Sequence, residues 1–165
     1  METSAIAGWS EFLVAAAGAV GALAGLLFVS LSINLARIIE APGISGRAAE
    51  TIILLAGTLA GILVLLMPHL SPAHLGMALA TVAVPTWFIP MAIQFRVLRE
   101  RKYYRRSYEV SRVVLYQVAA LPGVLACLAL GGFIPGGIAW FAVGVILSML
   151  VAVLNAWVLL VEILR

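Results

Sequence analysis

The chain has 165 residues, of which 64% are hydrophobic and only 10% are charged. Soluble domains carry about 25% charged residues, so this composition excludes an ordinary soluble globular protein. The net charge of +3 sits at the ends of apolar runs, which argues against a nucleic-acid-binding protein, whose basic residues form a continuous patch.

Three long stretches without charge determine the number of predicted membrane spans. Residues 12–36, 51–95 and 113–161 contain no Asp, Glu, Lys or Arg and are 25, 45 and 49 residues long. Because one helical crossing takes about 20 residues, the first stretch holds one span and each of the others holds two. The runs lack the alternation of barrel strands, and backbone amides must be paired in hydrocarbon. We therefore expect an all-α membrane bundle of five transmembrane helices, with residues 1–165 forming a single domain.

The five predicted spans are joined by segments of distinctive composition. They cover residues 12–35, 51–67, 73–95, 113–130 and 138–160. Residues rich in Gly, Pro and Ser predict turns at 41–46, 68–72 and 131–137. A basic segment without Gly or Pro joins the third and fourth spans. We expect both helices to extend beyond the bilayer there and to turn near Ser107.

The positive charges predict which way the bundle faces. With five spans, the 41–46 connection, the basic segment and the C-terminus share one face, which carries all ten Lys and Arg residues. Since Lys and Arg mark the cytoplasmic side, we expect the N-terminus outside and the C-terminus inside, in a bacterial inner membrane. Glu2 and Glu11 flank the first apolar run, where a cleaved signal peptide would begin with positive residues, so we expect no cleavage.

Small residues recur at four-residue spacing on three of the spans. These stripes are Ala17, Gly21 and Gly25; Gly57 and Gly61; and Gly144, Ser148, Ala152 and Ala156. Small residues let membrane helices approach closely, either within one bundle or at a subunit interface. With three stripes on five helices, one stripe can be left for a partner.

Polar residues inside the spans gather toward the cytoplasmic half. Ser148, Asn155 and Glu162 are seven residues apart and share one helix face. A buried amide or carboxylate in a membrane needs a partner and marks a candidate functional site, although interhelical hydrogen bonding alone can account for it. We predict a polar cluster composed of Asn34, Arg37, Asn155 and Glu162, closed by Arg47 or Glu50.

The remaining candidates each have a structural and a functional interpretation. Pro85 and Pro90 free the carbonyl groups of Thr81 and Thr86, which predicts a kink or a broken-helix site. His69 and His74 lie in a hairpin without enough further ligands for a metal site, so we expect no metal. The basic segment satisfies the positive-inside rule and can also bind anionic lipid headgroups. The residues predicted for headgroup binding are Arg101, Lys102, Arg105 and Arg106.

Three segments resemble a family of small bacterial polytopic membrane proteins of unknown function. The first begins at Phe28 and reads FVSLSINL, the second begins at Pro42 and reads PGISGRAAE, and the third begins at Asn155 and reads NAWVLLVE. The resemblance implies a small multi-pass protein and no particular activity. It includes most of the predicted polar cluster.

No pattern typical of an enzyme or a cofactor site is present in the sequence. The chain has no Asp, its one cysteine, Cys127, has no nearby base, and neither Ser-His-acid nor HExxH spacing occurs. We therefore expect a non-enzymatic protein without cofactor that acts by helix association, as a homo-oligomer or as an accessory subunit of a membrane complex. The alternative is an oligomeric channel or transporter that uses the polar cluster.

Overall fold

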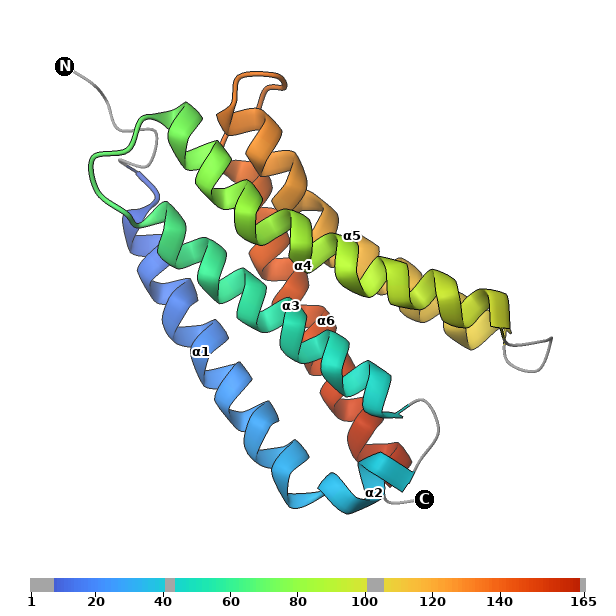
Figure 1. The fold of residues 1–165 in the computed structure, drawn as a ribbon. Coiled ribbons are helices and arrows are strands. Elements are labelled where there is room, and N and C mark those ends of the chain that lie inside the picture. Colours follow the sequence, from blue (N-terminus) through green and yellow to red (C-terminus); the bar gives the residue numbers. More distant parts are fainter. Residues whose placement is uncertain (1–7, 41–43, 101–105, 164–165) are drawn as a thin grey trace.

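The computed structural model describes residues 8–40, 44–100 and 106–163, which form helices and connections without any strand (Figure 1). The helices are α1 (Ser10–Ile33), α2 (Leu35–Glu40), α3 (Ile44–Leu65), α4 (Pro72–Glu100), α5 (Arg106–Leu130) and α6 (Ala139–Ile163). All of them except the short α2 are long and apolar enough to cross a membrane, which makes five candidate spans in this part of the chain. The predicted all-α class is confirmed, and so are five helices that are long and apolar enough to span a membrane.

One helix starts earlier than predicted. Helix α3 begins at Ile44, so Ser45 and Gly46 are helical and the predicted 41–46 turn was too long. As predicted, α4 and α5 continue into the basic segment, to Glu100 and from Arg106; Ser107 is helical, and residues 101–105 between the two helices lie outside the described residues. The second span was predicted to start at Thr51, where the charged residues end. A helix can continue past that point, because its backbone bonds form equally well beside charged side chains.

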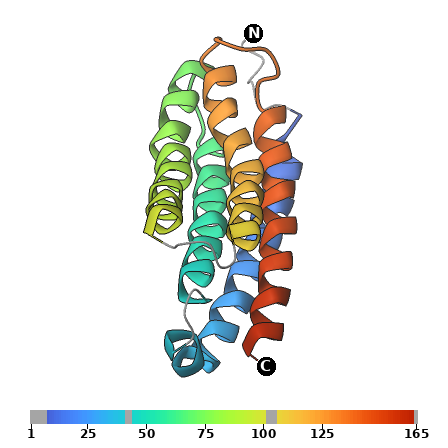
Figure 2. The ribbon, with the colours of Figure 1, turned by 90° about the vertical axis from the view of Figure 1, so that its right-hand side faces the viewer.

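Four helices surround a common centre, and α1 lies beside them. Helix α3 packs against α1, α4 and α6, while α5 packs against α4 and α6. Figure 2 shows the same bundle from the side, with the helices running roughly along one axis. A small cavity of about 30 Å³ lies where α3, α4, α5 and α6 meet, and it is lined partly by Thr58, Thr86 and Ser148. That volume accommodates about one water molecule, which is too little for a solute.

Glycines bring these four helices close together. A Cβ atom at Gly57 would collide with the side chain of Thr86 on α4, and one at Gly61 would lie 2.9 Å from the ring of Phe141 on α6. A Cβ atom at Gly144 would lie 3.3 Å from the backbone nitrogen of Gly123 on α5. The small residues of α3 and α6 therefore serve packing within the bundle.

The outward faces of the helices are apolar. Leu26 and Ile33 on α1 are 70% and 78% exposed, Phe88 on α4 is 53% exposed, and Trp157 on α6 is 63% exposed. Contiguous apolar surface of this kind is rare on soluble monomers. It is typical of helices that face lipid.

The two ends of the bundle differ in their connections. We call the end that carries the α3–α4 connection and the glycine-rich α5–α6 connection the hairpin end. Gly132, Gly136 and Gly137 there have φ values of 81°, 110° and 51°, in the left-handed region that favours glycine. The opposite end, where α3 and α5 begin and α4 and α6 finish, is called the basic end below.

Candidate functional site at the basic end of the bundle

A buried ion pair joins α3 to α5 near the basic end. Arg112 Nε donates to Glu50 Oε2 at 2.9 Å, and Arg112 Nη2 donates to Glu50 Oε1 at 2.6 Å. The two side chains are only 10% and 5% exposed. A bidentate pair between a guanidinium and a carboxylate is among the strongest side-chain interactions, because two parallel charge-assisted bonds fix its geometry. This pair ties two helices that are not neighbours in the sequence.

The guanidinium of Arg112 fits against a glycine on α3. A Cβ atom at Gly46 would lie 3.1 Å from Arg112 Nη2, so a larger residue would crowd the ion pair. Gly46 and Glu50 are one helical turn apart, which places both on the same face of α3. The first turns of α3 thus form a cradle for Arg112.

A chain of hydrogen bonds links α6 to the same segment of α3. Asn155 Nδ2 donates to Thr51 Oγ1 at 3.0 Å, and Thr51 Oγ1 donates to the carbonyl oxygen of Arg47 at 2.9 Å. All three residues are buried. Together with the ion pair, these bonds bring three helices into one polar layer, which we define as Arg47, Glu50, Thr51, Arg112 and Asn155.

A second set of polar contacts lies between α4 and α5, closer to the middle of the bundle. Tyr116 Oη donates to the carbonyl oxygen of Thr86 at 2.6 Å, and Trp87 Nε1 donates to Gln117 Oε1 at 2.6 Å. The Thr86 carbonyl is the group that Pro90 leaves without its helical bond. The tyrosine hydroxyl therefore satisfies a carbonyl that the proline has freed, and the Pro90 region serves helix packing.

Gln94 on α4 is buried without a hydrogen bond. It is 4% exposed, and neither its Nε2 nor its Oε1 has a partner among the residues that the structure describes. Burying an amide without a partner costs about 1–3 kcal/mol by mutational measures. Both polar atoms of the Gln94 side chain thus lack a hydrogen-bond partner among the described residues.

The structure brings together three of the six residues predicted for the polar cluster. Arg47, Glu50 and Asn155 lie in the polar layer. Asn34 ends α1, where its Nδ2 donates to the carbonyl oxygen of Ser30 at 2.9 Å, a bond within its own helical turn. Two side chains of the predicted cluster lie outside the described ones, those of Arg37 and Glu162.

The side chains predicted to bind lipid headgroups lie outside the described ones. Arg101, Lys102 and Arg105 fall outside the described residues, and Arg106 begins α5 with a side chain that is not described. Headgroup binding there stays a prediction.

Sequence reasoning missed Arg112 and Thr51 as members of the polar layer. Arg112 was assigned only to the basic segment. On α5, however, it lies one turn before Tyr116 and two turns before Ala119 and Ala120, all three of which are buried. That i, i+4, i+7 pattern is the signal that places Arg112 on the inward face.

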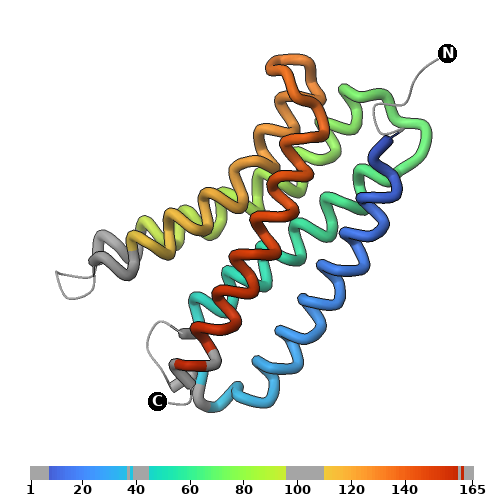
Figure 3. Tube along the Cα trace, turned by 180° about the vertical axis from the view of Figure 1, so that it is seen from behind, coloured from blue at the N-terminus to red at the C-terminus, as the bar shows by residue number. Residues whose placement is uncertain are grey.

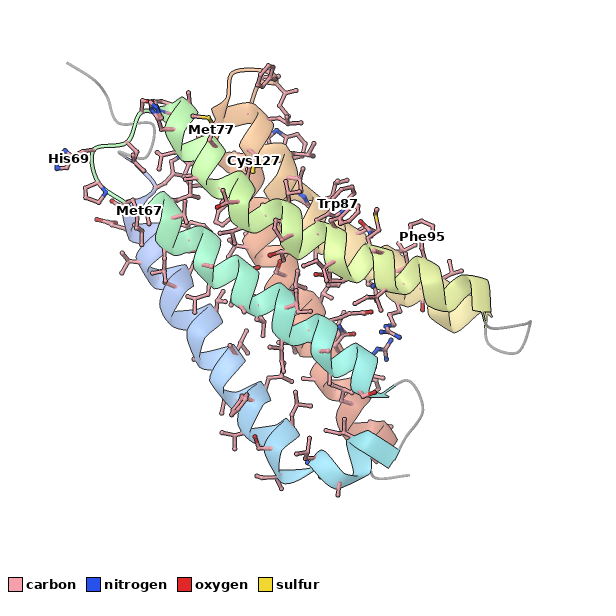
Figure 4. The ribbon with its side chains drawn as sticks, in the orientation of Figure 1. Met67, His69, Met77, Trp87, Phe95 and Cys127 are labelled. Carbon is pink, nitrogen blue, oxygen red and sulfur yellow. The ribbon has the colours of Figure 1, made fainter. Side chains whose placement is uncertain are left out.

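The histidines and the cysteine lie at the hairpin end. His69 is exposed with φ 64°, and Figure 4 shows it on the α3–α4 connection, pointing away from the helices. His74 Nδ1 lies 2.6 Å from Ser71 Oγ. Cys127 Sγ donates to the Gly123 carbonyl at 3.3 Å within α5. Among the described residues, no three His, Cys, Asp or Glu side chains gather closely enough to hold a metal ion.

Comparison of the chain with protein-family models, with curated protein sequences and with solved structures finds no match. The resemblance to a family of small bacterial membrane proteins therefore stays a prediction. The polar residues of the site join helices through charge-assisted and neutral hydrogen bonds.

Proposed function

We propose that this protein is a small non-enzymatic protein of the bacterial inner membrane that acts through helix association. In this proposal the N-terminus is outside, the C-terminus is inside, and the active form is a homo-oligomer or an accessory subunit of a membrane complex. Apolar outward faces and the concentration of Lys and Arg near one end support the membrane location and the orientation.

One observation carries the proposal: the face of α1 that carries Gly18 and Gly25 has nothing packed on it, although Ala17 of the predicted stripe packs against the core. Added Cβ atoms at Gly18, Gly21 and Gly25 would meet no atom within 4 Å. By contrast, Gly57 of α3 and Gly144 of α6 are in close contact with neighbouring helices. A glycine face offers lipid almost no side-chain area but lets another helix backbone approach closely.

The exposed face of α1 also has the period of a helix pair. Ala15, Gly18, Ala22, Gly25 and Val29 are all exposed and follow one another at alternating spacings of three and four residues. This is the 3.5-residue repeat at which two helices stay in contact along a left-handed supercoil. The face therefore suits a second transmembrane helix over several turns.

A matched pair of substitutions tests the association. Ala22→Leu enlarges the centre of the α1 face, while Ala92→Leu makes the same change at an exposed position of α4. Native mass spectrometry in lipid nanodiscs, with and without solubilised membrane proteins, measures both self-association and partner capture. We expect Ala22→Leu to lower the associated fraction at least about tenfold, because one misplaced side chain blocks backbone approach, and Ala92→Leu to leave it unchanged. A wild-type protein that stays monomeric and captures nothing would contradict the proposal.

The polar layer supports a second candidate, an oligomeric channel or transporter. Glu50, Thr51, Arg112 and Asn155 place charged and polar groups inside the bundle, as solute pathways require. The cavity at the bundle centre accommodates about one water molecule, so a pathway would have to run between subunits. A homo-oligomer with a central axis, together with solute flux into liposomes that the Asn155→Leu variant lowers, would favour this candidate.

A further inference from the structure

The helices of the bundle separate toward the basic end. Figure 1 shows α4 and α5 running side by side and leaning away from α3 and α6 in that half, and Figure 3 shows the same divergence from behind. At the hairpin end, in contrast, the contacts are tight. A Cβ atom at Gly76 of α4 would lie 3.0 Å from the Cys127 carbonyl of α5, and Leu79 of α4 lies against Gly61 of α3. The α4–α5 pair is thus held at one end and leans outward at the other.

Prolines interrupt the backbone hydrogen bonding of α4 and of α5 between these two ends. Pro85 and Pro90 lie inside α4, and Pro122 lies inside α5. Each removes one backbone hydrogen bond, and proline positions are where helices bend sharply. Thr86, between the two prolines of α4, is also the residue that contacts Gly57 of α3. The prolines of α4 therefore lie at the level of a tight contact with α3.

The Arg112–Glu50 ion pair crosses the separation. It is bidentate and buried, and it joins α5 to α3 on the basic side of the proline level. Removing one partner of a buried charge pair is strongly destabilising, because the other charge is left buried and uncompensated. Such a contact is either made or broken, which distinguishes it from the apolar contacts of the hairpin end.

Gln94 lies at the level of this ion pair on the leaning helix. It is eight residues past Thr86, about 12 Å along α4. Since α3 runs antiparallel to α4, eight residues back from Gly57 leads to Ala49, next to Glu50. Gln94 is buried with both polar atoms unpaired, so the present position of the α4–α5 pair leaves its amide unsatisfied.

We infer that the Arg112–Glu50 ion pair is a latch that holds the basic half of α4 and α5 against α3. When the latch opens, this half swings about the level of Pro85, Pro90 and Pro122. The movement uncovers Thr51 and Asn155 from the side of α5, while the hairpin end stays packed. The inference concerns a conformational change and is independent of whether α1 binds another helix.

Distances between paired spin labels test the latch in lipid nanodiscs. The inner pair is Ser45 on α3 with Val110 on α5, and the outer control pair is Leu63 on α3 with Leu128 on α5. All four positions are exposed, so labels there do not disturb the core. Each is changed to cysteine in a Cys127→Ala background.

The Glu50→Gln variant removes the charge and keeps the size of the side chain. We expect its inner distance to move to longer values by more than the width of the wild-type distribution, and its outer distance to stay the same. The exchange Glu50→Arg with Arg112→Glu should return the inner distance toward the wild-type value, because it rebuilds an ion pair in reverse.

Two results would overturn the latch. In the first, the inner distance of Glu50→Gln equals that of the wild-type protein, so the ion pair holds nothing in place. In the second, the outer distance changes as much as the inner one, both in Glu50→Gln and in the milder variant Arg112→Lys. The ion pair would then support the whole bundle and not the α4–α5 pair, since lysine keeps the charge and loses only the two-pronged geometry.

Discussion

Replacing Gly57 with alanine should destabilise the bundle, whereas replacing Gly21 with alanine should not. At Gly57, the new Cβ atom would lie 2.5 Å from Thr86 Cγ2 and 2.8 Å from Thr86 Cβ, closer than carbon atoms pack. Thr86 is β-branched, and its hydroxyl donates to the Val82 carbonyl at 2.8 Å, so its side chain has little freedom to rotate away. At Gly21, nothing lies within 4 Å of the new atom.

The size of the effect follows from comparing the two variants. Alanine is favoured over glycine in a helix by about 1 kcal/mol, and this gain is common to both sites. Forcing an extra carbon into a tightly packed contact costs about 1–3 kcal/mol. The free energy of unfolding of Gly57→Ala should therefore lie about 1–3 kcal/mol below that of Gly21→Ala, whatever the propensity gain is in lipid.

Reversible unfolding of the monomeric protein in mixed detergent micelles measures this difference. The double variant Gly57→Ala with Thr86→Ala is the internal control, because it removes the hydroxyl and Cγ2 and leaves only the contact with Cβ. The cost of Gly57→Ala should become smaller in that background without vanishing. Equal unfolding free energies for Gly57→Ala and Gly21→Ala would refute the argument that α3 uses its glycines for packing.

Three further predictions concern the polar contacts and the orientation. Tyr116→Phe should cost about 1–3 kcal/mol in the same unfolding assay, because the Thr86 carbonyl that Pro90 has freed stays buried without a donor; no loss would mean that another group replaces the hydroxyl. Asn155→Leu should cost only about 0.6 kcal/mol, the average for a hydrogen bond between membrane helices, so a pronounced loss of biological activity would indicate a functional role. In a cysteine-free background on intact cells, His69→Cys should react with an impermeant maleimide and Ser45→Cys should not, and the opposite pattern would refute the proposed orientation.

The number of candidate spans could be predicted because it depends on a one-dimensional quantity, the length of chain without charge, whereas the short α2 was not predicted. Residues 51–95 and 113–161 are too long for one crossing and long enough for two, and the structure has two helices in each. Helix ends were less predictable. Charged residues such as Arg47 and Glu50 lower the local hydropathy, but the helix continues through them. Both side chains are buried and have polar partners inside the bundle.

The polar layer was predictable in depth but not in direction. Distance from the span ends selected Asn34 and Asn155 alike, yet Asn155 bonds across to α3 while Asn34 bonds back within its own helix. Which of two polar residues finds an interhelical partner depends on the angle around the helix axis and on the neighbouring helix. A count of charged residues along the chain gives neither the angle around the helix axis nor the neighbouring helix. On α5 the structure supplies the angle: Arg112 lies one turn before the buried Tyr116, on the side of the helix that faces α3.

The contacts that join the helices differ between the two halves of the bundle. At the hairpin end, Gly61 and Gly76 let side chains and backbone meet at van der Waals distance, so any separation loses many small contacts at once. At the basic end, apolar side chains such as Ile38 and Ala48 are buried as well, and the directional Arg112–Glu50 pair joins α5 to α3 in addition. A partner helix on the exposed face of α1 would lie on the opposite side of α1 from α3, the helix that contributes Glu50, Thr51 and the Arg47 carbonyl to the polar layer. Such binding would reach the ion pair only through the contacts between α1 and α3.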